Sequence, residues 1–164
     1  MTLTVGADGR AAWRGRVLRC AIGRGGIARA KAEGDGATPA GRFPLRRVLF
    51  RADRVAAPDT ALPRAAIAPA DLWCDAPEDA LYNRAVRHPY PARAEPLWRA
   101  DACYDLLAVI GFNDDPVVAG AGSAIFLHVA RPDYAPTEGC VALAPTDLRD
   151  ILAGWQPDDR IAIG

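Results

Sequence analysis

Prolines and glycines break this chain into short pieces and so limit what it can fold into. There are 14 prolines and 15 glycines among its 164 residues, and proline neither continues a helix nor sits within a sheet without losing a hydrogen bond. The apolar residues between them gather in runs of about four to nine residues, a length typical of strands. The expected strands cover residues 2–5, 17–22, 43–49, 104–112, 124–129 and 140–143, with a closing strand at 161–163. The pattern predicts a mainly β protein.

Helix signals occur in only two places. Residues 146–152 carry one apolar face, and Thr146 or Asp147 can cap the N-terminus of a helix there. A shorter helix is expected over residues 92–99. The glycine-rich residues 23–27 follow a strand, but they lack the glycine spacing of a phosphate loop and no helix follows them. We interpret residues 23–27 as a turn and exclude a doubly wound α/β sheet.

Composition and charge exclude several classes of function. Apolar residues make up 51% of the chain, charged residues 24%, and the formal net charge is zero, so no overall field favours a nucleic-acid partner. No apolar run approaches the roughly 20 residues of a membrane span. The first ten residues lack the basic start and apolar stretch of a secretory signal, which indicates either a cytoplasmic protein or a mature form without its leader. We expect residues 1–164 to form a single domain that acts as a monomer.

The four cysteines do not form a metal-binding pattern. Cys20, Cys74, Cys103 and Cys140 lie far apart with no C-x-x-C pair, and the chain has only two histidines. A zinc site needs clustered ligands, so no metal is expected. Cys20 and Cys103 lie in apolar runs and are interpreted as small buried side chains. A disulfide between Cys74 and Cys103 is an alternative that nothing specific in the sequence favours.

One histidine and one cysteine lie at a spacing that suits nucleophilic catalysis. His128 ends an apolar run and stands 12 residues before Cys140. A thiol is mostly protonated at neutral pH, so a catalytic cysteine needs a base or a cation beside it. The loop over residues 130–138 is long enough to bring Cys140 back beside His128. Alternation along a strand puts His128 on the same face as Ala124 and Phe126.

The residues around Cys140 strengthen this interpretation. Gly139 permits a tight turn and close approach of a substrate, and the amides of Gly139 and Cys140 are candidates for an oxyanion hole. Thr137 offers a hydroxyl to orient a neighbouring group. The alternative is a structural cysteine near a buried core histidine, which would be favoured if either residue stood alone.

Two motifs together resemble one enzyme family. A histidine, a loop and then Thr137-Glu138-Gly139-Cys140-Val141 resembles the signature of the L,D-transpeptidase (YkuD-type) catalytic domain. Residues 37–43, Ala-Thr-Pro-Ala-Gly-Arg-Phe, are similar to the Thr-Pro-x-Gly-x-Phe element upstream in that family. The motifs are in the family's order, and the resemblance extends from about residue 17 to residue 152. It implies a mixed β-sandwich with a few short helices.

The resemblance also implies a mechanism and a substrate. Cys140 would be the acylated nucleophile, His128 its base, and Thr137 would replace a serine that helps to fix the histidine. The amides around Gly139 and Cys140 would form the oxyanion hole. The family attacks a peptidoglycan tetrapeptide stem after its third residue, a diaminopimelate, and transfers the acyl group to the amine of a second stem. Donor and acceptor stems are thus the implied partners and the cell envelope or periplasm the implied location, with neither metal nor organic cofactor.

The chain departs from the family at two positions near the cysteine. Glu138 stands where the family has histidine or arginine, and Ala142 stands where an arginine usually follows. Without that arginine, a bidentate contact to a substrate carboxylate is lost. Glu138 should raise the pKa of Cys140 if its side chain points inward. The expected substrate-binding residues are Glu138 with a replacement cation, for which the candidates are Arg131, Arg42 and Arg84.

Three alternatives to a transpeptidase stay open. Water instead of an amine would resolve the acyl-enzyme in an L,D-carboxypeptidase. A non-catalytic module that binds wall peptides would keep the fold without turnover, although binding alone does not require a thiol. An acyl-transfer or peptidase role in the cytoplasm would agree with the absence of a leader. Papain-like enzymes have cysteine before histidine, and the motifs of caspases and sortases are missing.

Overall fold

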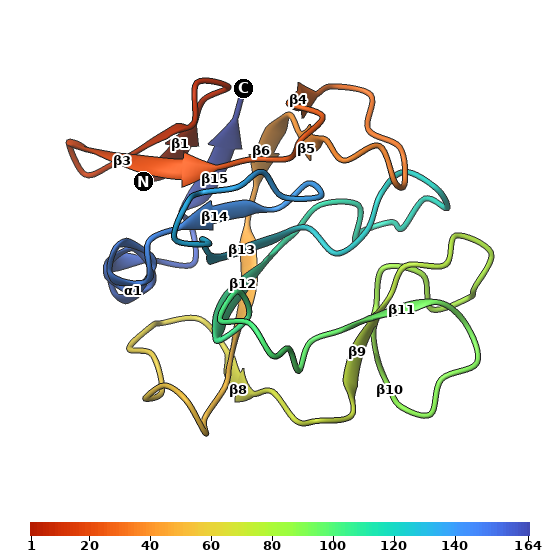
Figure 1. The fold of residues 1–164 in the computed structure, drawn as a ribbon. Coiled ribbons are helices and arrows are strands. Elements are labelled where there is room, and N and C mark those ends of the chain that lie inside the picture. Colours follow the sequence, from red (N-terminus) through yellow and green to blue (C-terminus); the bar gives the residue numbers. More distant parts are fainter.

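The computed structural model describes residues 1–164, and its centre is a mixed ten-stranded sheet that curls like half a barrel (Figure 1). Across the sheet the strands are β6 (Gly41–Phe43), β15 (Arg160–Ile163), β1 (Thr2–Val5), β2 (Arg10–Trp13), β3 (Arg16–Ala21), β14 (Val141–Leu143), β13 (Phe126–Val129), β12 (Leu106–Ile110), β7 (Leu45–Phe50) and β8 (Arg64–Ala66). The predicted mainly β class is confirmed. Each of the seven predicted strands is present, with ends shifted by at most two residues.

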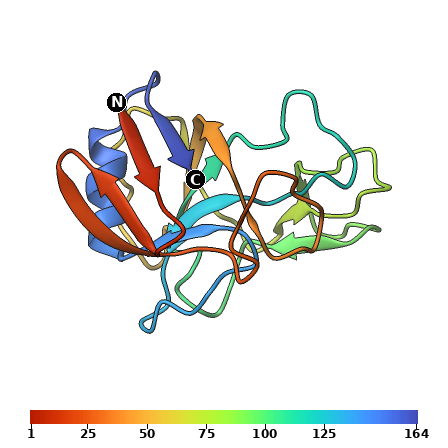
Figure 2. The same cartoon turned by 90° about the horizontal axis from the view of Figure 1, so that it is seen from above.

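Smaller elements surround the main sheet. Strand β9 (Asp71–Cys74) pairs with β10 (Ala85–Arg87) and β11 (Ala94–Pro96) in a three-stranded sheet. Strands β4 (Ile27–Ala28) and β5 (Thr38–Pro39) form a short parallel pair. Helix α1 (Pro145–Gly154) and the three-stranded sheet lie at opposite ends of the molecule in Figures 1 and 2. No helix is both long and apolar enough to cross a membrane.

Two apolar clusters lie on opposite faces of the central strands. The larger cluster, of 24 buried residues, is enclosed by the two halves of the curled sheet and α1, and includes Ile125 and Leu127. The smaller, of 11 residues, includes Ala124, Phe126 and Cys140. Residues 124–127 therefore alternate between the two faces as the sequence predicted. That alternation puts His128 on the face of the smaller cluster, which also carries Cys140.

Helix α1 forms where the sequence predicts a helix, but it begins differently. Its first residue is Pro145, and no side chain caps its N-terminus. The missing N–H of proline costs nothing at the first helical position, where it would have no intrahelical partner. The predicted cap at Thr146 or Asp147 is therefore wrong. The buried face consists of Leu148, Ile151 and Leu152, which pack against the larger cluster.

The helix expected over residues 92–99 is wrong, because this segment contains β11. Glu95 of β11 pairs with Trp73 of β9, and Pro96 next to it would disrupt a helix. The pairing with β9 supplies backbone hydrogen bonds that a local helix would otherwise have to provide. Strands β2, β8 and β10 were not predicted, because they are short and rich in alanine and arginine rather than in apolar side chains. All four cysteines are free and buried, so the alternative disulfide is absent.

Trp155, just after α1, gives a test of the larger core. Its ring is fully buried and stacks on Trp13, with 5.4 Å between ring centres, while its Nε1 has no hydrogen-bond partner. Trp155→Ala should lower the free energy of unfolding by about 3–5 kcal/mol. Trp155→Phe should cost clearly less, because it removes a buried, unpaired N–H worth about 1–3 kcal/mol along with part of the ring. Urea unfolding followed by circular dichroism measures both; equal costs would contradict the assignment of an unpaired N–H.

Candidate active site

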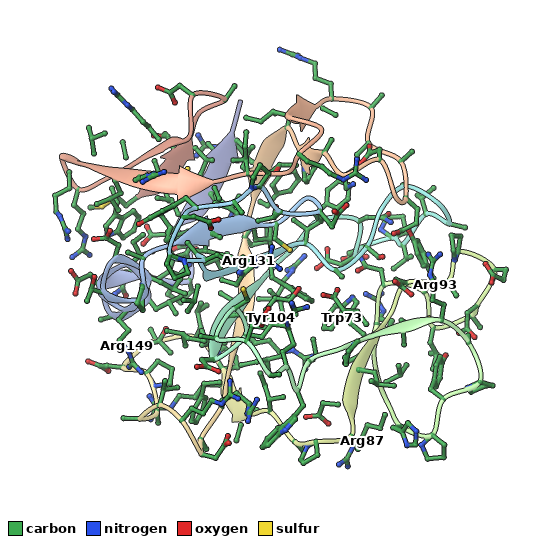
Figure 3. All side chains as sticks on the ribbon, viewed as in Figure 1. Trp73, Arg87, Arg93, Tyr104, Arg131 and Arg149 are labelled. Atoms are coloured by element: carbon green, nitrogen blue, oxygen red, sulfur yellow. The ribbon has the colours of Figure 1, made fainter.

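A cavity of about 440 Å³ opens on the face of the sheet that carries His128. Its walls come from the loop between β4 and β5, from β11 and the segment leading to β12, from the two ends of β13, and from the turn before β14. His128 and Cys140 both line it. Two further lining residues, Tyr104 and Arg131, are labelled close together near the centre of Figure 3. The structure thus brings the predicted pair to one cavity.

Parallel pairing of β13 with β14 sets the relative position of the two residues. His128 pairs with Ala142, and Leu127 with Val141. Cys140 comes one position before Val141 and so lies beside Phe126, on the same face as His128. His128 and Cys140 are therefore diagonal neighbours. Ala142 also lines the cavity, and its small side chain leaves space beside the His128 ring.

Strand β13 and Tyr104 fix the His128 ring. Nδ1 lies 2.9 Å from the carbonyl oxygen of Val129. Since a carbonyl oxygen only accepts, Nδ1 carries the proton and donates it, which leaves Nε2 as a free acceptor. The Tyr104 ring contacts the imidazole edge-to-face, with 5.3 Å between ring centres. Burial lowers the pKa of His128 to about 4, so the ring is neutral at pH 7.

The Cys140 thiol is held against the start of β13. Its Sγ donates to the carbonyl oxygen of Ala124 at 3.3 Å and accepts from the backbone N–H of Phe126 at 3.3 Å. Burial, with a smaller effect from the Glu95 carboxylate, raises the pKa of Cys140 to about 12. No hydrogen bond joins Sγ to the His128 ring. At neutral pH the resting pair is therefore a thiol and a neutral imidazole, not a thiolate and an imidazolium.

Thr137 braces the turn before Cys140 and does not contact His128. Its hydroxyl donates to the carbonyl oxygen of Cys140 at 2.6 Å and accepts from the N–H of Gly139 at 3.1 Å. The Gly139 amide is thus already bonded, whereas the Cys140 amide has no partner in the protein. Of the two amides expected to face an oxyanion, only that of Cys140 is left without a partner in the protein. Thr137 was expected to help fix His128. Its hydroxyl instead bonds to the backbone of the turn before Cys140.

The upstream motif supports the same turn from behind. The backbone N–H of Gly23 donates to the buried hydroxyl of Thr38 at 2.8 Å, and Gly23 forms a β-bridge with Thr137. Gly139 has φ +136°, and a Cβ built there would lie 2.8 Å from the carbonyl oxygen of Ala37. Only glycine allows that conformation and that approach. The two motifs, far apart in sequence, thus form one backbone assembly around Cys140.

Glu138 lines the cavity, but its carboxylate is bonded to Arg24. Its exposed carboxylate accepts two hydrogen bonds from Arg24 Nε, at 2.9 and 3.1 Å. The pKa of Cys140 is raised by the Glu95 carboxylate, and Glu138 is not among its causes. Glu138 was expected to raise the pKa of the thiol; Glu95 of β11 has that effect instead.

The candidate cations are divided between the cavity and the rest of the surface. Arg131 lines the cavity and lies 3.9 Å from Asp101. Arg42 is on β6, where its guanidinium donates to the Thr2 hydroxyl at 3.2 Å. Arg84 donates to the carbonyl oxygen of Asp114 at 2.8 Å. Neither Arg42 nor Arg84 lines the cavity, so of the three only Arg131 is placed to meet a substrate there.

Several side chains of the cavity were not predicted from the sequence: Lys31, Glu33, Glu95, Arg99, Tyr104 and Ser123. Lys31 was detectable as the sole lysine of the chain, but its burial was not. Glu95 and Arg99 lay in the segment misjudged as a helix, and their approach to Cys140 depends on the pairing of β11 with β9. No group of three or more histidine, cysteine, aspartate or glutamate side chains is arranged to hold a metal ion.

Comparisons with known proteins match this chain to a protein family and to a solved structure. The L,D-transpeptidase catalytic domain family matches residues 1–163. Among solved structures, the chain is similar to an L,D-transpeptidase from Mycobacterium smegmatis, with a TM-score of 0.43 and 12% sequence identity. That alignment covers 99% of this chain and 58% of the other, so the chain spans less than two thirds of the length of that protein. No match was found among curated protein sequences.

Substitution of Gly139 tests the close approach behind the turn. Gly139→Ala should lower the free energy of unfolding by about 2 kcal/mol or more, because it combines backbone strain with a clash against the Ala37 carbonyl. Gly120→Ala is the matched control: Gly120 also has a positive φ, +76°, but its Cβ would meet nothing within 4 Å. That control should cost only about 1 kcal/mol. Chemical denaturation compares the two; a Gly139 variant no worse than the control would refute the clash.

The charge state of the resting pair predicts a pH profile. With the Cys140 pKa at about 12, the thiolate fraction should rise about tenfold for each pH unit between 7 and 9. Alkylation of Cys140 by iodoacetamide, located by peptide mass spectrometry, should rise in the same proportion. A thiolate–imidazolium pair would instead give a rate that is already level near pH 7. A level profile would show that the resting pair is ionised.

Proposed function

Because this chain belongs to the L,D-transpeptidase catalytic domain family, we propose that it cross-links or remodels peptidoglycan stem peptides through a thioester at Cys140. One observation carries the proposal: Cys140 and the neutral His128, whose Nε2 has no hydrogen-bond partner, line a single cavity of about 440 Å³. Residues 1–164 would act as one catalytic domain. The family implies the cell envelope as the place of action.

Acylation follows from the neutral state of the pair. As Sγ attacks the carbonyl carbon of the third stem residue, His128 Nε2 takes the thiol proton, so that charge separates only when the bond forms. The unbonded Cys140 amide stabilises the oxyanion. When the C–N bond breaks, the imidazolium gives its proton to the amine of the departing D-residue. The products are the thioester, a neutral imidazole and the free amino acid.

The acceptor decides the second half of the reaction. An amine from another stem forms a C–N bond at the thioester carbon, the C–S bond breaks, and Cys140 recovers its proton through His128. Water attacking the same carbon yields a tripeptide instead, as in a carboxypeptidase. The positions of Cys140 and His128 serve both outcomes equally, so the hydrolase is kept as the second candidate.

Mass spectrometry after incubation with purified disaccharide-tetrapeptide tests the nucleophile. The wild-type protein should give a cross-linked dimer, and Cys140→Ala should abolish product while leaving the fold intact by circular dichroism. Cys20→Ala is the matched control, because Cys20 is a buried thiol of the larger core that does not line the cavity. Cys20→Ala should keep its activity.

The other outcomes separate the alternatives. Tripeptide without dimer would make the protein a hydrolase that uses the same nucleophile. Product formation by Cys140→Ala would refute Cys140 as the nucleophile. Unchanged substrate with the wild-type protein would favour a module that binds wall peptides.

A further inference from the structure

Two of the three cations of the cavity, Lys31 and Arg99, are hydrogen-bonded to carboxylates. Lys31 Nζ donates to Asp35 at 2.6 Å. Arg99 donates to both carboxylate oxygens of Asp101, at 2.8 and 2.7 Å, and Arg131 lies 3.9 Å from the same carboxylate. Arg131 is therefore the one cation of the cavity that makes no hydrogen bond to a carboxylate.

Two carboxylates of the cavity, in contrast, have no cation within hydrogen-bond distance. Glu33 accepts hydrogen bonds only from hydroxyls, those of Ser123 (2.7 Å) and Tyr82. Glu95 accepts only from the Tyr104 hydroxyl, at 2.5 Å through Oε1, with the Arg99 guanidinium 3.9 Å away. No protein donor reaches Glu95 Oε2. Because an ionised carboxylate in a partly dry cavity requires compensation, this arrangement favours a cationic ligand.

Glu95 is also the carboxylate that acts directly on the reacting thiol. Its charge contributes to the raised pKa of Cys140, and its partner Tyr104 contacts the His128 ring. Burial and the nearby carboxylates Glu33 and Asp75 raise the pKa of Glu95, which makes it a better proton acceptor than an ordinary carboxylate. A cation bound to Glu95 would therefore lie beside Cys140 and would lower the cost of forming a thiolate there.

We propose that Glu95 binds the primary ammonium of the acceptor stem and takes up its proton before the amine attacks the thioester. This inference rests on the proposed function and assigns the selection of an amine over water to one residue of β11. The ligand chemistry is a primary ammonium on a flexible side chain, which is the group that a diaminopimelate presents. A charge-assisted hydrogen bond to Glu95 Oε2 would hold it.

The acceptor ammonium loses two protons during the transfer. The ammonium gives one proton to the Glu95 carboxylate and becomes a neutral amine. The lone pair of that amine forms the C–N bond, the C–S bond breaks, and Cys140 leaves as a thiolate. A second amine proton passes through His128 Nε2 to the thiolate, which restores the thiol and the neutral imidazole. Glu95 then releases its proton to solvent.

A binding experiment tests the ammonium site without any turnover. The probe is the tripeptide stem that ends in diaminopimelate, which lacks a terminal D-residue and so cannot act as a donor. NMR titration should show the probe binding to the wild-type protein about tenfold more tightly than its side-chain N-acetylated form. Glu95→Gln should bind the two forms equally. The control Glu78→Gln, an exposed acid that does not line the cavity, should keep the wild-type preference.

The ratio of products tests the role in selecting the acceptor. With tetrapeptide as donor, Glu95→Gln should lower the ratio of dimer to tripeptide about tenfold or more. Donor should be consumed at a rate no lower than that of the wild-type protein, because Glu95→Gln removes a negative charge that opposes the Cys140 thiolate. Alkylation of Cys140 at pH 8 should become faster in the same variant, since a negative charge near the thiol is removed.

The outcomes distinguish failure of this inference from failure of the proposed function. Equal binding of the two probe forms by the wild-type protein, or a preference retained by Glu95→Gln, would overturn the ammonium site. An unchanged product ratio in Glu95→Gln would overturn its role in acceptor choice, as would a loss confined to donor consumption. Absence of any Cys140-dependent product would refute the transpeptidase, while the titration would still decide whether Glu95 binds an ammonium.

Discussion

Backbone hydrogen bonds between the parallel strands β13 and β14 hold His128 and Cys140 on one face of the sheet. Parallel pairing requires the chain to return over the whole length of β13, and the loop at residues 130–139 does so. The end of that loop is fixed by Thr137 and by the backbone of Gly23, which in turn is bonded to Thr38. The side chains of the site are therefore positioned by main-chain contacts, and the short strands suffice because each is anchored at both edges.

Burial decides the charge states in the cavity. It raises the pKa of Cys140 and lowers that of His128, and both shifts favour the neutral forms. The site thus resembles a general-base arrangement, in which the nucleophile forms as the substrate is attacked, more than a preformed ion pair. A neutral resting thiol also reacts slowly with unrelated electrophiles. In the proposed reaction the thiol is activated only when the substrate is bound. The charged side chains of the cavity therefore affect that step.

The cations and the carboxylates of the cavity differ in the partners to which they are hydrogen-bonded. Lys31 and Arg99 are hydrogen-bonded to aspartates, whereas Glu33 and Glu95 are held only by hydroxyl groups at hydrogen-bond distance. Ala142, which stands where the family usually has an arginine, contributes to this difference. Ala142 lines the cavity and carries no charge, so β14 supplies no cation to the carboxylates there. An incoming ammonium would supply the missing charge.

The sequence by itself determined seven of the strands, helix α1 and the face of β13 that carries His128, because the period of apolar residues is a local property. It also identified Cys140 and Gly139 through a motif whose turn requires glycine. Tertiary structure alone decided the rest. Pairing of β11 with β9 placed Glu95 at the cavity, overriding the local helix signal, and packing brought Glu138 against Arg24. Hydrogen bonds of Thr137 and the burial of both catalytic candidates depend on contacts between residues far apart in the chain, which no local pattern records.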